Sequence, residues 1–155
     1  MPQLNIRPAT PEDSPQILAF IRELAQCERE PDAARATAAD LLRDGFTDPR
    51  RFHCLIAEQG TEPAGFALYF YSYSTWLGRA GIYLEDLFVR PVFRGKGIGK
   101  ALLTRVATIA VAEGCGRLEW AVLDWNQPAI DFYHRMGATP MSEWTTMRVT
   151  GDALS

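Results

Sequence analysis

The sequence predicts a single α/β (α+β) domain in which a mixed, mainly antiparallel sheet is flanked by helices. Three strand-like runs follow one another at 52–58, 63–73 and 82–89 with short connections, which favours antiparallel neighbours. Apolar residues at helical spacing lie before and after these runs. With 155 residues, 47% of them hydrophobic, the chain can build one sizeable core and is short for two domains.

The N-terminal part predicts a strand and two helices. Residues 4–7 read as a short strand, and Thr10 is placed to cap a helix that ends near Cys27. The apolar residues of this helix recur at helical spacing: Ile17, Phe20, Ile21 and Leu24. Residues 28–36 show no period and predict a loop. A second helix begins at Thr37, with Asp40 in a capping-box position, and runs to Gly45.

The C-terminal half predicts two more helices and two more strands. A helix follows the third strand, with its apolar stripe at Ile98, Leu102, Val106 and Ile109, and ends at 114–116. Residues 117–123 predict a strand, Asn126 caps a helix to Met136, and 144–149 predict the last strand. We expect one domain over residues 1–150 and a frayed tail over 151–155.

The turn between the third strand and its helix predicts a phosphate site. Its sequence is Arg94-Gly95-Lys96-Gly97-Ile98-Gly99-Lys100. A helix N-terminus offers unpaired N–H groups and partial positive charge to an anion, and close glycines let a ligand approach the backbone. A P-loop is disfavoured because Ala101 stands where the magnesium-binding hydroxyl belongs, and the dinucleotide fingerprint closes one residue early.

These residues resemble the acetyl-CoA pyrophosphate loop of the GCN5-related N-acetyltransferases. The resemblance to the spermidine/spermine (diamine) acetyltransferase branch extends over nearly the whole chain, through 6–10, 83–89, 124–128 and 131–133. It implies an enzyme that transfers the acetyl group of acetyl-CoA directly to a primary amine of a small cationic substrate in a ternary complex. It also implies a homodimer.

Glu85 and Asp86 are the carboxylates that stand out, because they interrupt an otherwise apolar strand. A primary amine must lose a proton before it attacks, which costs about 4–5 kcal/mol at pH 7, so a base is needed. The resemblance implies that Glu85 is this base, acting through water, with Asp86 nearer the substrate or in a structural bond. Adjacent strand residues point to opposite faces, so only one of the two is expected to face a given cleft. Alternatively, both pair with surface arginines.

Tyr133 is the predicted acid. In the family pattern, the tyrosine of Asn126-Gln127-Pro128…Phe132-Tyr133 protonates the departing thiolate. Without the resemblance, Tyr133 is an ordinary packed helix aromatic. Asn126 is either a helix cap or a cofactor contact. The cofactor residues that the resemblance implies are Leu87, Phe88, Val89, Arg94, Gly95, Lys96, Gly97, Ile98, Gly99, Lys100, Asn126, Ala129 and Tyr133.

The acceptor residues are less well matched to the family. Cys27 stands where the polyamine enzymes have a tyrosine before Glu28, which favours a lysine-like amine such as thialysine over spermidine or spermine. The implied substrate-binding residues are Cys27, Glu28, Glu85, Asp86, Glu119, Trp120 and Ala121. Trp76 or Tyr83 is a further possible wall of the pocket. Alternative activities are acetylation of an amino acid, antibiotic or peptide amine, or acetyl-CoA binding without turnover.

Composition excludes several other classes. The chain has no long apolar run and no leader-like start, so we expect a cytoplasmic protein without a membrane span. A net charge of −3 without a basic stripe argues against nucleic acid as a partner. Cys27, Cys54 and Cys115 lack metal spacing, and His53 and His134 lack partners at metal or triad spacing, so no metal site is predicted.

Overall fold

The computed structural model describes residues 3–155; Met1 and Pro2, the first residues of the predicted domain, lie outside this range. By its internal contacts the chain divides into two compact units, Met1–Ala121 and Val122–Ser155. The first unit contains the sheet and three α-helices, and the second contains one α-helix. Among the described residues, no helix combines the length and the apolar character that a membrane crossing requires.

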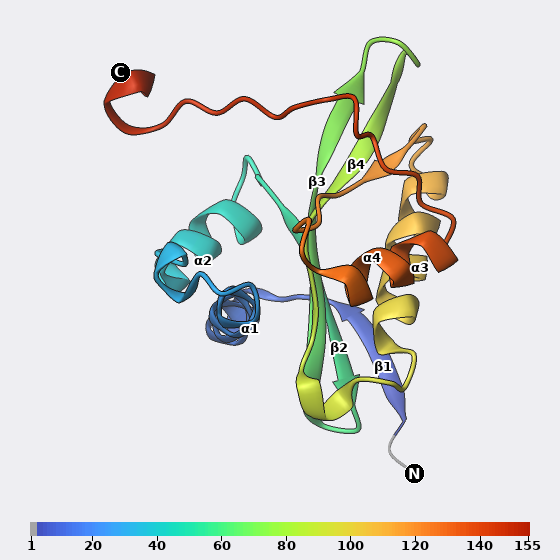
Figure 1. The fold of residues 1–155 in the computed structure, drawn as a ribbon. Coiled ribbons are helices and arrows are strands. Elements are labelled where there is room, and N and C mark those ends of the chain that lie inside the picture. The colour runs from blue at the N-terminus through green and yellow to red at the C-terminus, as the bar shows by residue number, and fades with distance from the viewer. Residues whose placement is uncertain (1–2) are drawn as a thin grey trace. The chain divides into compact units, whose positions relative to one another are not determined.

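The sheet has five strands in sequence order, of which β1 to β4 are labelled in Figure 1. They are β1 (Leu4–Pro8), β2 (His53–Gln59), β3 (Glu62–Ser74), β4 (Arg79–Val89) and β5 (Leu118–Glu119). Every neighbouring pair is antiparallel except β4 and β5, which are parallel. Short turns join β2 to β3 and β3 to β4, and such turns connect antiparallel neighbours, whereas β5 returns after a helix. The predicted mixed, mainly antiparallel sheet is confirmed.

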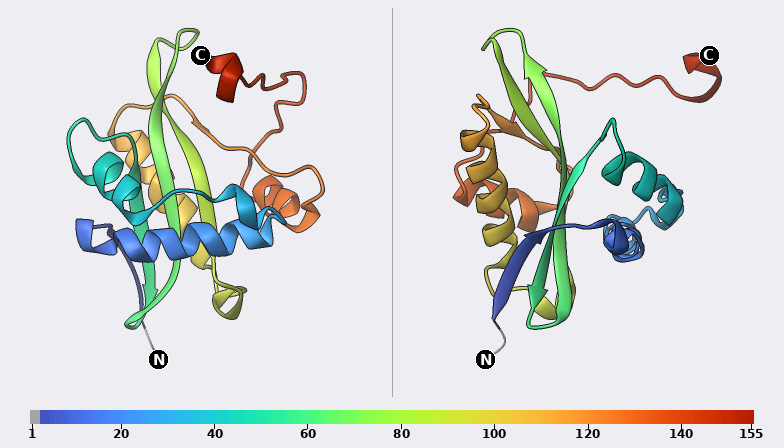
Figure 2. Two further views of the ribbon diagram at one scale, coloured as in Figure 1. Left: turned by 90° about the vertical axis from the view of Figure 1, so that its left-hand side faces the viewer. Right: turned by 180° about the vertical axis from the view of Figure 1, so that it is seen from behind.

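Helices cover both faces of the sheet (Figure 2). Helices α1 (Ser14–Cys27) and α2 (Ala38–Phe46) lie on one face, and α3 (Ile98–Ala112) lies on the other. Between the first two helices and the sheet is a core of buried residues in which the Phe20 ring stacks on Phe66 with centroids 5.2 Å apart. Its buried members are Ile17, Phe20, Leu41, Phe52, Cys54, Ile56, Phe66, Leu68 and Phe88.

The two predicted N-terminal caps are present. The Thr37 hydroxyl accepts a hydrogen bond from the Asp40 N–H at 3.1 Å, and the Asp40 carboxylate accepts one from the Thr37 N–H at 2.9 Å. Thr10 makes a similar box with Asp13, although a short 3-10 turn at Pro11–Asp13 separates it from α1. These reciprocal bonds satisfy donors that a helix start leaves unpaired. Helix α2 therefore begins directly after its predicted cap Thr37, whereas α1 begins after the 3-10 turn, with Asp13 as its N-cap.

The end of α1 is fastened to the end of β4 by Arg90. Its Nε and Nη2 atoms donate to the two carboxylate oxygens of Glu23, each at 2.9 Å, and its guanidinium lies 4.9 Å from the centroid of the Phe20 ring. A third bond runs from Nη1 to the Pro63 carbonyl at 3.1 Å. A bidentate arginine pair fixes geometry as well as adding stability, so Arg90 holds the C-terminal half of α1 beside the strand that carries Glu85.

The strand predicted at 117–123 is shorter than expected. Only Leu118 and Glu119 form β5, opposite Ile82 and Tyr83. A strand needs a neighbouring backbone to take its hydrogen bonds, and no ladder continues beyond Glu119 among the described residues. Strand propensity over 120–123 therefore overstated the length of the element.

In the second unit, α4 (Gln127–Arg135) is the predicted helix, and Gly137 follows it with a φ of 91°. The strand predicted at 144–149 is wrong, because this segment has no regular structure and exposes Trp144, Met147 and Val149. These apolar residues do not alternate strictly, and within residues 3–155 no strand pairs with the segment. The tail expected to be frayed forms a short exposed 3-10 helix at Gly151–Leu154.

Candidate active site

A β-bulge on β4 coincides with the two carboxylates that the sequence singled out, Glu85 and Asp86. Leu68 of β3 lies opposite Asp86, but the next residue, Tyr69, lies opposite Leu84, so Glu85 is the extra residue. A bulge bends its strand and breaks the alternation of side chains. The expectation that Glu85 and Asp86 face opposite sides assumed regular alternation, and the bulge removes that assumption.

Glu28, at the C-terminal end of α1, completes an acidic cluster with these two residues. Burial raises the pKa of Asp86 to about 7, with further contributions from the charges of Glu85 and Glu28. Burial likewise raises the pKa of Glu28, and Glu85 adds to the effect. Within the described range, the ion pairs give neither Glu85 nor Asp86 an arginine partner, against the alternative of surface pairs. The acidic cluster Glu28–Glu85–Asp86 thus gathers negative charge that favours a cation.

An aromatic pair borders the acidic cluster. The rings of Phe70 and Tyr83 lie 5.3 Å apart on neighbouring strands. Burial raises the pKa of Tyr83, and the charges of Glu85 and then Glu119 raise it further. Glu119 lies opposite Tyr83 in the ladder between β4 and β5. The sequence left Tyr83 undecided and did not single out Phe70; their positions across from each other in β3 and β4 could have indicated the pair.

The other implied acceptor residues follow β5. Trp120 is half-buried and Ala121 is exposed, and both come directly after the last paired residue of the strand. Trp76 is on the turn between β3 and β4 and has 84% of its surface exposed. Of the two aromatics proposed for the pocket wall, the fold therefore brings Tyr83, and not Trp76, next to the acidic cluster in this unit.

The glycine loop has the form that an anion site requires. Gly97 is the N-cap of α3 with a left-handed φ of 82°, and no side chain caps the helix start. Gly95 has a φ of 80°, and an added Cβ at either glycine would meet no atom within 4 Å. The open backbone and the uncapped N–H groups fit the pyrophosphate of acetyl-CoA. Ile98 is buried and anchors the helix, while Gly99 and Lys100 follow it in the first turn.

Arg94 links this loop to the C-terminal end of α1. Its Nε donates to the Val89 carbonyl at 2.8 Å, and its Nη2 lies 3.7 Å from the Cys27 Sγ. The guanidinium also lies 5.7 Å from the centroid of the Phe88 ring. Cys27 directly precedes Glu28, so this contact joins the phosphate loop to the end of α1. The charge of Arg94 is thereby held on the α1 side of the loop, while the Lys96 ammonium lies 5.6 Å from the Phe93 ring centroid.

The end of β4 offers an open edge. Ile82 and Tyr83 pair with β5, whereas Leu87, Phe88 and Val89 lie beyond the last paired position on that side among the five strands. Phe88 is 3% exposed and belongs to the core, while Leu87 and Val89 are half-buried. An unpaired strand edge can take an extended ligand by hydrogen bonding, as the family resemblance implies for the pantetheine arm.

The remaining predicted residues belong to the second unit. The Asn126 side chain accepts a hydrogen bond from the Ala129 N–H at 3.3 Å, so the cap is the role that the structure shows for it. Tyr133 lies on α4 with its ring 5.4 Å from that of Phe132. Asn126, Ala129 and Tyr133 are thus positioned by one helix, as their spacing predicts.

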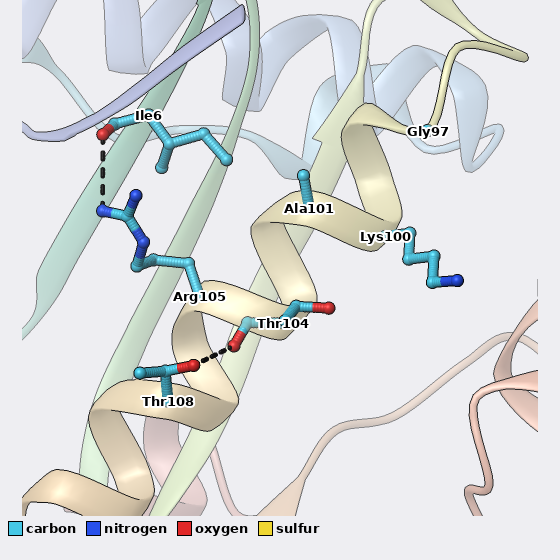
Figure 3. Close-up of a pocket in the computed structure, with 7 residues that line it drawn as sticks. All are labelled: Ile6, Gly97, Lys100, Ala101, Thr104, Arg105 and Thr108. Atoms are coloured by element: carbon cyan, nitrogen blue, oxygen red, sulfur yellow. Dashed lines mark hydrogen bonds between the residues drawn. The ribbon is translucent and has the colours of Figure 1, made fainter.

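A hollow of about 400 Å³ borders the glycine loop and runs along α3 (Figure 3). Arg105 crosses it and donates to the Ile6 carbonyl at 3.4 Å, while Lys100 extends on the side of α3 away from Ile6. Its lining residues are Ile6, Gly97, Lys100, Ala101, Thr104, Arg105 and Thr108. None of the acidic residues lines it, so it is separate from the acceptor side.

His53 and Cys54 have the surroundings of packed residues. His53 packs against Tyr69 and Tyr71, with ring centroids 5.5 and 5.4 Å away, and burial lowers its pKa. Cys54 is buried, and that burial raises the pKa of its thiol, which opposes nucleophilic reactivity. In the part of the chain that the structure describes, no three metal-ligating side chains gather.

Comparison with known proteins places these features in a family context. A model of the acetyltransferase (GNAT) family matches residues 18–138. Thialysine N-epsilon-acetyltransferase of Sus scrofa is 41% identical over 165 aligned residues, covering 99% of this chain and 96% of that protein. L-ornithine N5-acetyltransferase of Arabidopsis thaliana is 54% identical over 59% of this chain and 40% of its own length.

Solved structures show the same fold. An integron cassette protein from the mobile metagenome of V. cholerae superposes with a TM-score of 0.82 at 28% identity, covering 97% of this chain and 94% of that one. An aminoglycoside acetyltransferase from an uncultured soil sample gives a TM-score of 0.80 at 18% identity, over 96% of this chain and 97% of that one. The second likeness bears on the fold alone.

Proposed function

Because the chain belongs to the acetyltransferase (GNAT) family and is an acetyl-CoA-dependent N-acetyltransferase, we propose that its acceptor is the side-chain amine of a small lysine-like molecule. The observation that carries this proposal is the acidic cluster Glu28–Glu85–Asp86, joined to the glycine loop by the contact between Arg94 and Cys27. The relatives that act on thialysine and ornithine support an acceptor that is an amino acid with a second amine.

The glycine loop is proposed to hold the cosubstrate. The backbone N–H groups at Gly97 to Lys100 face the diphosphate, Lys96 and Lys100 add positive charge, and the edge at Leu87 to Val89 takes the pantetheine arm. Acetyl-CoA supplies an acetyl group activated as a thioester. The chain's own contribution is to hold that group beside the acidic cluster. The bond from Arg94 to the Val89 carbonyl supports this, because it ties the glycine loop to the end of β4.

Glu85 is the proposed base. It is the exposed residue of the bulge, so water can reach its carboxylate and carry a proton from the amine. Asp86 and Glu28 attract the cationic form of the amine before that proton is removed. The pKa of Asp86 is about 7, close to neutral pH, so the carboxyl can release its proton when a cation binds.

Tyr133 is the proposed acid, whose Oη donates a proton to the leaving sulfur. The support is its place in the motif from Asn126 to Tyr133, and the capped helix that carries it. The aqueous pKa of a phenol lies above that of a thiol by about 1.5 units, so this transfer costs about 2 kcal/mol unless the site stabilises the phenolate or the transfer is concerted with bond breaking.

Two further parts of the proposal concern the setting of the enzyme. The family resemblance supports a homodimer, whose test is the mass of the protein in solution. The thiols of Cys27, Cys54 and Cys115 are all free, which supports a reducing compartment and hence the cytoplasm.

The test is a thiol-release assay with acetyl-CoA and a panel of amines: thialysine, lysine, ornithine, spermidine, spermine, an aminoglycoside and a peptide. The proposal expects fastest release with the amino acids that carry a second amine. Binding of acetyl-CoA, seen as thermal stabilisation, without thiol release for any amine would contradict it and favour a non-catalytic module.

A further inference from the structure

Arg117 and Glu119 form an ion pair beside the aromatic pair Phe70–Tyr83. The Arg117 Nη1 lies 3.6 Å from the Glu119 Oε1, and the two side chains are 39% and 42% exposed. The Arg117 Nη2 also donates to the Ser74 Oγ at 2.9 Å, and that oxygen accepts a bond from the Leu77 N–H at 3.1 Å. The guanidinium is thus held in place by the turn between β3 and β4 while donors remain for a ligand.

This pair lies on the same face of the sheet as Tyr83. Glu119 is opposite Tyr83 in the ladder, and its charge contributes to the raised pKa of that phenol. A Cβ added at Gly81 would lie 3.1 Å from the Arg117 Cγ, so the glycine lets the arginine stem cross β4 closely. Residues 81 and 83 share a face because strand side chains alternate. Glu85 also contributes to the raised pKa of Tyr83, so the ion pair, Tyr83 and Glu85 lie near one another.

The spacing suits an amino acid with a side-chain amine. Glu85 is two residues from Tyr83, a separation of at most about 7 Å along the bulged strand, and the neighbouring strand is about 5 Å to the side. An extended lysine side chain spans about 6 Å from its Cα to its nitrogen. An amine placed at Glu85 would therefore put the α-carbon of such a molecule near Tyr83 and the ion pair.

We propose that Arg117 and Glu119 form the subsite that binds the α-carboxylate and α-ammonium groups of a lysine-like acceptor whose side-chain amine lies at Glu85. Arg117 pairs with the carboxylate through its planar donors, and Glu119 accepts from the ammonium. The inference rests on the proposed function. It adds Arg117 to the acceptor residues and gives Glu119, which the resemblance already implied, a defined group to bind. A polyamine has no carboxylate to pair with Arg117. The Arg117 guanidinium would instead repel the second ammonium group of the polyamine.

Four acceptors distinguish the contact of Arg117 with the carboxylate from the contact of Glu119 with the ammonium group. Lysine has both head groups, 6-aminohexanoate lacks the α-amine, 1,5-diaminopentane lacks the carboxylate, and 1-aminopentane lacks both. Arg117→Gln should lower kcat/KM at least about 10-fold for lysine and 6-aminohexanoate while leaving 1,5-diaminopentane unchanged or improved. Glu119→Gln should lower it for lysine and 1,5-diaminopentane but spare 6-aminohexanoate.

Control variants distinguish a loss of acceptor selection from a general loss of protein stability. Arg117→Lys should recover part of the activity on 6-aminohexanoate, and Arg79→Gln, at the first residue of β4, should leave activity on all four acceptors unchanged. Equal losses of Arg117→Gln on every acceptor, or no loss on lysine, would overturn the subsite. Failure of the parent enzyme to acetylate any of the four would instead count against the proposed function.

Discussion

Beyond the effect of burial, the negative charge of Glu28, at the end of α1, acts on Asp86 of β4 and helps to raise the pKa of that carboxyl. Burial is the first cause that raises the pKa of Asp86 to about 7, and the charges of Glu85 and Glu28 follow. The bulge at Glu85 and the docking of α1 by Arg90 create this arrangement. An amine cation that enters between them would relieve the repulsion, so the cluster is poised for a positively charged acceptor.

Asp86→Asn should stabilise the protein more at pH 8 than at pH 5. An unfolded aspartate ionises near pH 3.9, whereas folded Asp86 keeps its proton until about pH 7, so the stability linked to this proton is lost as pH rises through that window. The gain at pH 8 should exceed that at pH 5 by about 2 kcal/mol in urea denaturation. Asp32→Asn, at an exposed carboxylate, is the control. Equal gains at the two pH values would contradict the raised pKa.

Gly97→Asp should weaken acetyl-CoA binding by about 1–3 kcal/mol, because it places a side chain and a negative charge at the proposed diphosphate site. Gly114→Asp is a matched control, since Gly114 has a similar φ of 73° and equally open surroundings at the other end of α3. Both variants should lose thermal stability, but only the first should lose affinity by calorimetry. Unchanged affinity for Gly97→Asp would remove the loop from the cofactor site.

Glu85→Gln should move the optimum of kcat/KM to higher pH. Without a base, the reaction depends on the fraction of amine already deprotonated, and that fraction rises tenfold per pH unit well below a pKa of about 10.4. The measurement is a pH–rate profile of the parent and the variant with one amine. Glu62→Gln, an exposed glutamate on β3, should keep the parent profile, and the same profile for Glu85→Gln would require another base.

Tyr133→Phe should lower kcat by about 100-fold or more while leaving acetyl-CoA affinity unchanged, because only the proton donor is removed. Turnover and binding are measured separately, by thiol release and by calorimetry. Tyr71→Phe removes a hydroxyl from a half-exposed tyrosine on β3 and serves as the control. A variant that turns over like the parent enzyme would show that another group protonates the thiolate.

Glu28→Gln should raise KM for the acceptor by about 2–5-fold with little change in kcat, since a partly exposed charge contact contributes about 1 kcal/mol or less. The difference should shrink at high salt, where such contacts are screened. Glu30→Gln, two residues further on in the exposed loop, should behave as the parent enzyme. A fall in kcat at constant KM would instead place Glu28 in the chemical step.

Much of the fold follows from local sequence. The capping residues Thr37 and Asn126 fix helix starts, apolar spacing gives α1 and α3, and short turns make β2, β3 and β4 antiparallel. The prediction of a strand at 144–149 was wrong. Strand propensity is a property of the segment alone, whereas a strand also requires a neighbouring backbone to pair with.

For the site, the glycine loop and the candidate residues Glu85, Asp86 and Tyr133 could be picked out from the sequence, because their motifs lie within short stretches of chain. Three relationships could not: the effect of the Glu28 charge on Asp86, the contact between Arg94 and Cys27, and the pairing of Glu119 with Tyr83. These contacts depend on strand register, on the bulge, and on how α1 docks against the sheet. Such features arise from packing between residues distant in the chain, and local propensity carries no information about them.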